Sequence, residues 1–301
     1  MNQGYAYRER IGARAAGTTL LEYLEHRYSH TSRIEWARRI LTGRVTLDGR
    51  PAEAGSPLRA GQRLVWNRPG WIEPEAPVGF ALLHVDEDLI AVAKPSGLPT
   101  LPGGGFLENT LLARVRAFDP VATPLHRLGR FTSGLLLFGR SPRARRILCR
   151  DFRQGRIVKR YRALACGIPL QQEFDVRIPI GRVPYPPLGD LYAADDSGKP
   201  SRSRVRFLEA SGADSLLEIT IETGRPHQIR IHLAAAGHPL VGDPLYGSGG
   251  RPLRGTAALP GDPGYALHAH RLELSHPVSG ERLVLQCIPP PPLRLRYEAT
   301  P

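Results

Sequence analysis

A polar, basic segment that runs directly into an apolar one, residues 126–138, constrains the fold of this chain more than any other stretch. Thr132, Ser133 and Gly134 are turn-forming residues, and residues 135–138 are continuously apolar, as in a buried strand. The residues before Thr132 are therefore expected to form a loop held by a rigid strand, a common place for functional side chains. The alternative is a basic surface turn that precedes a core strand and has no function of its own.

The charge of the chain indicates a polyanionic partner. Among 301 residues there are 41 Lys or Arg against 28 Asp or Glu, a formal net charge of +13. Most of the basic residues are Arg, whose planar guanidinium binds phosphate through two hydrogen bonds. Twelve Lys or Arg and only one acid lie between His126 and Arg162. Nucleic acid fits this pattern better than a membrane does, and a generally basic surface without a specific partner is the alternative.

The chain is long enough for two domains joined by a linker. Residues 67–79 hold several prolines and no hydrophobic periodicity, which is typical of a linker, and the polar residues 1–17 predict a loose arm. We therefore expect domains at 18–66 and 80–292 and a tail at 293–301. The cysteines lack C-x-x-C spacing, and neither a signal core nor a membrane-spanning stretch is found, so we expect a cytoplasmic protein.

Capping patterns and turn residues predict the elements of the first domain. Helix starts are expected at Thr19 and Ser32, each followed three residues later by Glu, and Asp48-Gly49 predicts a hairpin turn before a strand at 64–66. The second helix is expected to end at Gly43. Its apolar residues recur at helical spacing: Ile34, Ala37, Ile40 and Leu41.

Two short helices followed by a β-ribbon resemble the S4 RNA-binding domain. The line S-R-I-E-W-A-R-R-I-L-T-G-R-V-T-L-D-G is similar to the core pattern of that family. The resemblance implies RNA contacts from arginines on or near the second helix: Arg33, Arg38, Arg39 and Arg44. A small helical domain that binds another protein is the alternative.

Several segments of the larger domain resemble the RluA-type RNA pseudouridine synthases. Residues 126–135 are similar to the signature H-R-L-D-x-x-T-S-G-L, and residues 94–98 to the N-K-P-x-G-L segment of that family. Residues 159–161 match its K-x-Y motif. Residues 224–233 match G-R-x-H-Q-I-R-x-H-L, and residues 237–247 match the G-H-P-x-x-G-D-x-x-Y-G that follows. These motifs occur in the family's order and, with the S4-like part, span roughly residues 18–292.

The resemblance implies an α+β fold, in which helices flank a mixed, mostly antiparallel sheet. Arg127 would fill the space left by a base flipped out of the RNA, Tyr161 would stack on that base, and Arg230 would pair with a catalytic carboxylate. Other basic residues would contact RNA: Arg130, Arg225, Arg143, Arg146, Arg150 and Lys159. The protein would be a monomer that acts on ribosomal rather than transfer RNA, by analogy with S4-bearing relatives.

Gly129 stands at the position where the family has its nucleophilic Asp. A glycine supplies neither a nucleophile nor a partner for Arg230, and Asp119, Asp151 and Asp243 are the candidate substitutes. Asp243 is expected to pin its own turn, and Asp151 to pair with arginines of its helix. Two hypotheses follow: a pseudouridine synthase with a displaced carboxylate or variant mechanism, and an inactive relative that binds RNA or assists ribosome assembly.

The remaining expectations concern secondary structure and cofactors. Ser141-Pro142 predicts a helix that ends near Gln154, residues 226–237 predict another helix, and residues 179–200 predict a long loop. The isomerisation of uridine requires no cofactor. The six histidines after Pro226 lack nearby cysteine partners and tight ligand spacing, so no metal site is expected.

Overall fold

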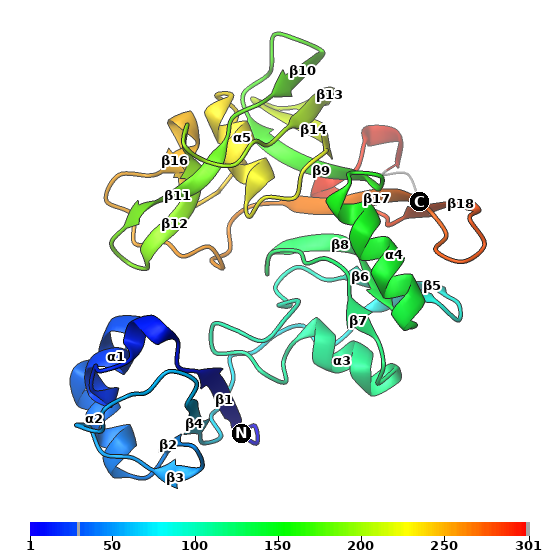
Figure 1. The fold of residues 1–301 in the computed structure, drawn as a ribbon. Coiled ribbons are helices and arrows are strands. Elements are labelled where there is room, and N and C mark those ends of the chain that lie inside the picture. Colours follow the sequence, from blue (N-terminus) through cyan, green and yellow to red (C-terminus); the bar gives the residue numbers. More distant parts are fainter. Residues whose placement is uncertain (29–30, 299–301) are drawn as a thin grey trace. The chain divides into compact units, whose positions relative to one another are not determined.

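The computed structural model describes residues 1–28 and 31–298 and divides the chain into two compact units, Met1–Glu73 and Pro74–Pro301 (Figure 1). The first unit packs helices against an antiparallel sheet. Its strands are, in spatial order, β1 (Tyr5–Arg10), β4 (Arg63–Arg68), β2 (Val45–Leu47) and β3 (Arg50–Pro51). Its helices are the 3₁₀ turn η1 (Ala13–Ala15), α1 (Leu20–Arg27) and α2 (Arg33–Leu41).

Residues 1–17 are not a loose arm, and the expectation was wrong. Strand β1 pairs with β4 in register from Tyr5 opposite Arg68 to Arg10 opposite Arg63. Tyr7 stacks on Trp66, with ring centroids 4.9 Å apart, and Ile11 is buried in the core of the unit. Aromatic residues at alternate positions are typical of strands, but their partner strand lies more than fifty residues away along the chain.

Helix α2 starts at the predicted cap but buries a different face. The Ser32 hydroxyl accepts a hydrogen bond from the Glu35 amide, and Trp36 and Ile40 enter the core. Ile34 and Leu41, expected to be part of the apolar face, are 83% and 87% exposed. The buried face of α2 contains Trp36, because its indole offers more apolar area than the side chain of Ile34 or of Leu41.

The second unit is built on a ten-stranded sheet (Figure 1). Its main path runs β10 (Glu173–Val176), β13 (Ser203–Ser211), β14 (Asp214–Ile221), β9 (Val158–Cys166), β17 (Leu267–Ser275), β8 (Thr132–Gly139), β6 (Leu89–Lys94) and β5 (Ala81–Val85). Two further strands are β18 (Arg282–Gln286), beside β17, and β7 (Thr123–Pro124), beside β8. Among the strand pairs of the described residues, only β17–β8 is parallel, which confirms the predicted mixed, mostly antiparallel α+β fold.

Helices and smaller hairpins accompany this sheet. The helices are α3 (Leu111–Phe118), α4 (Pro142–Arg153) and α5 (Gln228–Ala235). The hairpins are β11 (Ile180–Tyr185) with β12 (Gly189–Ala194), and β15 (Tyr246–Gly247) with β16 (Arg251–Pro252). Short 3₁₀ turns are η2 (Ser248–Gly250), η3 (Pro291–Leu293) and η4 (Arg296–Glu298). Helix α4 has the predicted Ser141 cap, whereas α5 begins two residues later than expected because His227 is left-handed, with φ 55°.

Two predicted irregular regions are ordered. Residues 179–200, expected to be a long loop, contain the β11–β12 hairpin, which packs on α5 and buries residues such as Ile180 and Ala193. The described part of the predicted tail, residues 293–298, packs on the sheet, where Leu293 is fully buried and Arg162 bonds to Glu298. Composition missed both, because proline and glycine content says nothing about distant packing partners.

Gly134 allows β17 to lie directly beside the start of β8. Its φ is +105°, and a Cβ at this position would lie only 2.2 Å from the carbonyl oxygen of Ala269 on β17. Gly134 is aligned with Ala269 in the parallel register. A glycine is therefore required where the loop of residues 126–131 joins the sheet.

We expect Gly134→Ala to destabilise the second unit by on the order of 3 kcal/mol, because it adds a steric clash to backbone strain. All three tryptophans, Trp36, Trp66 and Trp71, lie in the first unit, so circular dichroism should report the loss while tryptophan fluorescence stays unchanged. Gly79→Ala is the control, since a Cβ there meets nothing within 4 Å. Equal melting temperatures for the two variants would contradict this interpretation.

Candidate active site

One cavity of the second unit brings together five of the predicted site residues. Arg127, Gly129, Tyr161, Arg225 and Arg230 all line it, although they come from three separate segments of the chain. Its volume is about 110 Å³. That is on the order of the space that one small ring occupies, since a cavity of about 150 Å³ binds benzene.

The loop that carries Arg127 and Gly129 is held by a buried lysine. The Nζ of Lys94, at the end of β6, donates to the carbonyl oxygens of Pro95, Leu98 and Arg130 at 2.7–2.9 Å. Burial lowers the pKa of this amino group to about 7, whereas three carbonyl acceptors favour its charged form. The Thr100 hydroxyl donates to the Leu128 carbonyl in the same region. The loop is thereby fixed at backbone level against residues 94–100.

Arg230 is paired with Asp243, one of the three carboxylates named as candidate substitutes. Its Nε and Nη2 donate to the two carboxylate oxygens at 2.6 and 2.7 Å, and its Nη1 donates to the Pro260 carbonyl at 3.1 Å. The carboxylate also accepts from the amides of Leu245 and Tyr246. Asp243 therefore pins its own turn, as predicted, and at the same time neutralises Arg230.

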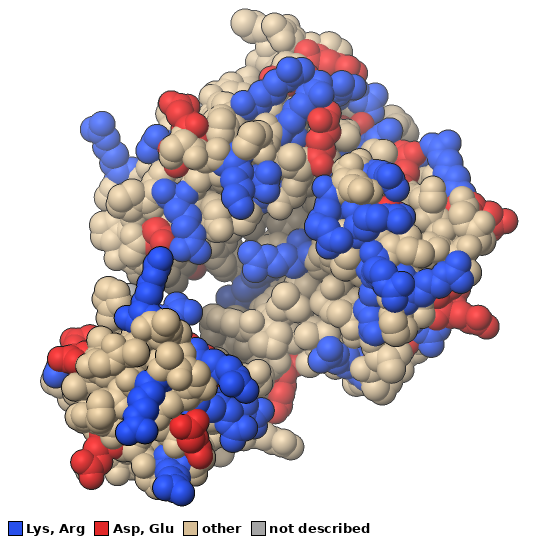
Figure 2. Space-filling view, viewed as in Figure 1, with Lys and Arg blue, Asp and Glu red and all other residues tan. Residues whose placement is uncertain are grey.

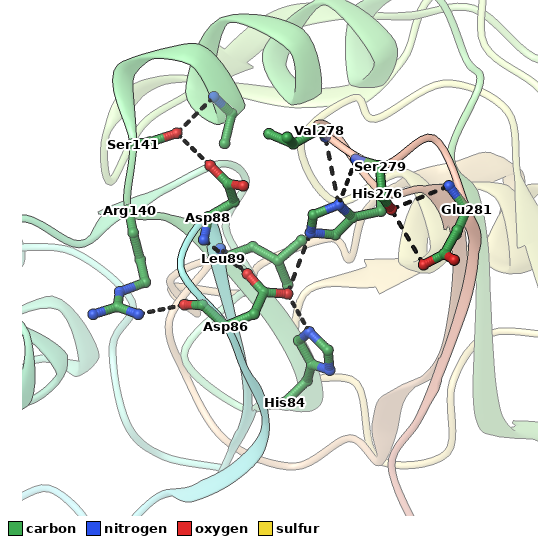
Figure 3. A network of polar contacts seen from close by, with 11 residues as sticks. His84, Asp86, Asp88, Leu89, Arg140, Ser141, His276, Val278, Ser279 and Glu281 are labelled. Carbon is green, nitrogen blue, oxygen red and sulfur yellow. Dashed lines mark hydrogen bonds and ion pairs between the residues drawn. The ribbon is translucent and has the colours of Figure 1, made fainter.

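No carboxylate lines the cavity among the residues that the structure describes. The side chain of Asp243 is only 1% exposed and lies behind Arg230. Asp119 pairs with Arg140, which also donates to the Asp86 carbonyl in a separate polar network around Asp86 and His276 (Figure 3). Asp151 pairs with Arg150 and Arg156, close to the prediction for that residue.

The backbone at Gly129 would accept a side chain. Its φ lies outside the left-handed region, and a Cβ would lie 3.3 Å from the hydroxyls of Thr132 and Tyr265, so these two side chains must move by a few tenths of an ångström to admit it. A carboxylate at this position would thus begin beside two hydrogen-bond donors at the edge of the cavity. Thr132 and Tyr265 were not predicted, and Tyr265 belongs to no motif that could have revealed it.

His227 is a further lining residue that sequence reasoning missed. Its Nδ1 lies 2.6 Å from the Tyr246 hydroxyl, which donates to the Tyr192 carbonyl of β12 at 2.6 Å. Burial, aided by the nearby charges of Arg230 and Arg127, lowers the pKa of His227 to about 3. The ring is therefore neutral at physiological pH. Its place inside the G-R-x-H-Q-I-R motif was the one available signal.

Tyr161 and Arg127 line the cavity with polar groups that have no partner among the described residues. Tyr161, on β9, is 7% exposed, and burial raises the pKa of its hydroxyl, which stays neutral. Arg127 is exposed, and the described residues contain no hydrogen-bond or ion-pair partner for it. The Arg225 guanidinium donates twice to the Pro200 carbonyl and still reaches the cavity.

The other predicted RNA-contacting residues divide into two groups. Arg143, Arg146 and Arg150 are exposed on α4, where Figure 2 shows blue side chains gathered. Arg130 instead helps to hold the loop by donating to the Gly97 carbonyl. Lys159 is buried in β9 at 6% exposure, so its expected contact with RNA is not available in this structure, because alternation on the strand turns it inward.

The four arginines predicted in the first unit also differ in exposure. Arg33 and Arg38 are exposed and pair with Glu25 and Glu35. Arg39 packs against Trp36 and Trp66, with its guanidinium carbon 4.7 and 4.4 Å from the ring centroids. It therefore contributes to packing. Arg44 is half-buried beside β2.

The described residues hold neither a candidate metal cluster nor a candidate membrane-spanning helix. No three or more His, Cys, Asp or Glu side chains are grouped so that they could hold a metal ion. Among the helices of residues 1–28 and 31–298, none has the length and apolar character needed to cross a membrane.

The fold and the sequence both resemble known pseudouridine synthases. The structure of human RNA pseudouridylate synthase domain containing 1 is similar, with a TM-score of 0.58 and 25% identity, over 74% of this chain and 89% of that one. Residues 88–235 match the family described as RNA pseudouridylate synthase.

Two relatives extend this resemblance. An uncharacterized RNA pseudouridine synthase of Synechocystis sp. is 46% identical over 91% of this chain and 95% of its own length. Ribosomal large subunit pseudouridine synthase D of Nitrosomonas europaea is 39% identical over 69% of this chain and 61% of its own length. The chain belongs to the RNA pseudouridine synthase family.

We expect Asp243→Asn to destabilise the second unit by about 3–5 kcal/mol, because it leaves the buried Arg230 guanidinium without a counter-charge. Chemical unfolding followed by circular dichroism should show this loss. Asp190→Asn is the matched control, since Asp190 forms an exposed pair with Arg182 and should cost less than about 1 kcal/mol. Equal losses in the two variants would show that the Arg230 pair does not support the fold.

Proposed function

We propose that this protein is an RNA pseudouridine synthase that acts on ribosomal RNA and receives its target uridine, flipped out of the RNA, in the cavity. The observation that carries the proposal is the convergence of Arg127, Tyr161 and Arg230 on one cavity the size of a pyrimidine base. The choice of ribosomal RNA is supported by the name of the Nitrosomonas europaea relative.

The chemistry assigns different roles to these side chains. The bond between N1 of uracil and C1′ of ribose breaks, the base rotates, C5 bonds to C1′, and the proton of C5 is transferred to N1. Tyr161, neutral and partly open to the cavity, would stack on the base while it rotates. Arg127, which has no partner among the described residues, would occupy the position that the base vacates in the RNA.

The catalytic carboxylate is the part of the family pattern that this chain lacks. Asp243 is the one candidate beside Arg230, but its oxygens already accept from Arg230 and from two backbone amides. A carboxylate so bound is a weak nucleophile. We propose that Asp243 orients Arg230 and that the reaction runs by a variant mechanism without a carboxylate at position 129.

A second candidate function is RNA binding without isomerisation, as in a ribosome-assembly factor. It is favoured by the absence of a carboxylate from the described lining of the cavity. In both functions, Arg143, Arg146 and Arg150 of α4 would contact the phosphate backbone. The first unit would act as an S4-like RNA-binding domain, with Arg33 and Arg38 as its most exposed predicted contacts.

Mapping of pseudouridine in total RNA, with and without the gene, tests the proposal. We expect at least one ribosomal uridine to be modified only when the gene is present, and a plasmid copy to restore it. Tyr161→Ala should slow its formation by on the order of 100-fold, because the base is no longer positioned. Arg143→Ala changes a residue of α4 that does not line the cavity. It should weaken RNA binding instead. If deletion removes no pseudouridine, the protein is not a synthase and the RNA-binding function is favoured.

Gly129→Asp tests whether the carboxylate is the missing part. Because the φ of Gly129 suits any residue and a Cβ needs only small shifts of the Thr132 and Tyr265 hydroxyls, we expect the variant to fold. It should raise the initial rate of pseudouridine formation by at least about tenfold, since removal of nucleophiles costs orders of magnitude. Gly129→Asn, which has the same shape without the charge, is the control and should give no increase. An Asp variant that is no faster than the natural chain would show that the chemistry depends on other groups.

A further inference from the structure

The hydrogen bonds of His227 determine which of its ring nitrogens carries the proton. The Tyr192 carbonyl can only accept, so the Tyr246 hydroxyl gives its proton to that carbonyl. The hydroxyl oxygen must then accept from His227, which places the imidazole proton on Nδ1. His227 is consequently the tautomer in which Nε2 has a lone pair and no proton.

Nε2 is left for a ligand. Tyr246, the partner of Nδ1, does not line the cavity, whereas His227 does, so the opposite edge of the imidazole is the edge available to the cavity. The described residues provide no partner for Nε2. Burial and the two neighbouring arginine charges oppose protonation of the ring, so Nε2 stays an acceptor across the physiological pH range.

The backbone supports a constrained role for this side chain. His227 is one of two non-glycine residues with positive φ among the described residues, at 55°, and it precedes α5 directly. This conformation is uncommon for residues other than glycine, and histidine is among the few that adopt it more often. It directs the ring of His227 so that one edge reaches Tyr246 while the residue still lines the cavity.

We propose that His227 Nε2 accepts a hydrogen bond from the N3–H of a uracil base in this cavity and thereby selects uracil over cytosine. N3 of cytosine has no proton, so two lone pairs would face each other. The remaining polar lining favours the same base: the cavity presents Arg127, Arg225 and Arg230 and no carboxylate. These cations suit the O4 acceptor of uracil, and the described lining offers no carboxylate to accept from the N4 amino group of cytosine.

This selectivity rests on the proposed function in one respect, namely that the cavity receives a pyrimidine base. It adds a specificity-determining residue that the isomerisation itself does not require. A site built to bond one hydrogen-bonding group rejects a ligand that lacks it, because its own polar atom is then left unpaired.

Binding of uridine 5′-monophosphate and cytidine 5′-monophosphate to the full chain tests the inference. We expect the natural protein to bind the uridine nucleotide at least tenfold more tightly by calorimetry. In His227→Asn the amide nitrogen can take the place of Nδ1 and bond to Tyr246, but no acceptor remains at Nε2. Asparagine also tolerates the left-handed backbone. The preference should fall to within about twofold, mainly through weaker binding of the uridine nucleotide.

Two further variants separate selectivity from general damage. His227→Gln places an amide oxygen near the position of Nε2 and should restore part of the preference. His238→Asn is the matched control, because His238 Nδ1 bonds to the Cys166 carbonyl and the residue does not line the cavity. It should leave the ratio of the two affinities unchanged. A purely structural role of His227 would weaken both nucleotides equally and leave that ratio intact.

A spectroscopic measurement keeps the inference testable if a variant fails to fold. Nitrogen-15 spectra of histidine-labelled natural protein should show His227 with an unprotonated Nε2, shifted by the uridine nucleotide and not by the cytidine nucleotide. A protonated Nε2, equal affinities for the two nucleotides, binding of neither, or an unchanged preference in His227→Asn would each overturn the inference. A protein that selects uridine monophosphate but forms no pseudouridine would retain this inference and lose the proposed isomerase activity.

Discussion

The buried ion pair between Arg230 and Asp243 organises one side of the cavity. Asp243 holds the guanidinium through two hydrogen bonds and accepts from the amide of Tyr246, so one carboxylate positions both an arginine and a tyrosine. The Tyr246 hydroxyl in turn accepts a hydrogen bond from Nδ1–H of His227. A charge that is removed from water is costly unless it is paired, and this pairing therefore gives Arg230, Tyr246 and His227 a single arrangement. The polar lining of the cavity follows from that arrangement.

The opposite side depends on backbone carbonyls. Lys94 binds three of them, and Gly134 lets the strand that follows the loop approach β17. The two sides meet around a cavity that is lined by cations and neutral aromatic groups. No carboxylate of the described residues lines it. Such a lining suits a base rich in carbonyl oxygens. A reaction that needs a carboxylate at this position would need it at Gly129, beside the hydroxyls of Thr132 and Tyr265.

Local patterns predicted local structure well and distant packing poorly. Ser141-Pro142 predicted the start of α4, and Asp48-Gly49 predicted the hairpin turn, where both residues have positive φ. These signals act within a few residues, through caps and turn geometry. Strand β1 and the β11–β12 hairpin were missed because their stability comes from partners far along the chain. The inward turn of Lys159 has the same origin, since only the assembled sheet decides which face of β9 is buried.

The sequence by itself determined the family, the basic character, and five of the residues that line the cavity, because motifs of adjacent residues carry them. Only the tertiary structure decided what those residues are bonded to. It paired Arg230 with Asp243, removed Asp119 and Asp151 from consideration, and brought Tyr265 beside Gly129. It also set the proton of His227 through Tyr246 and a carbonyl of β12. Hydrogen bonds and ion pairs between distant segments depend on distances of a few ångströms, which spacing along a chain does not encode.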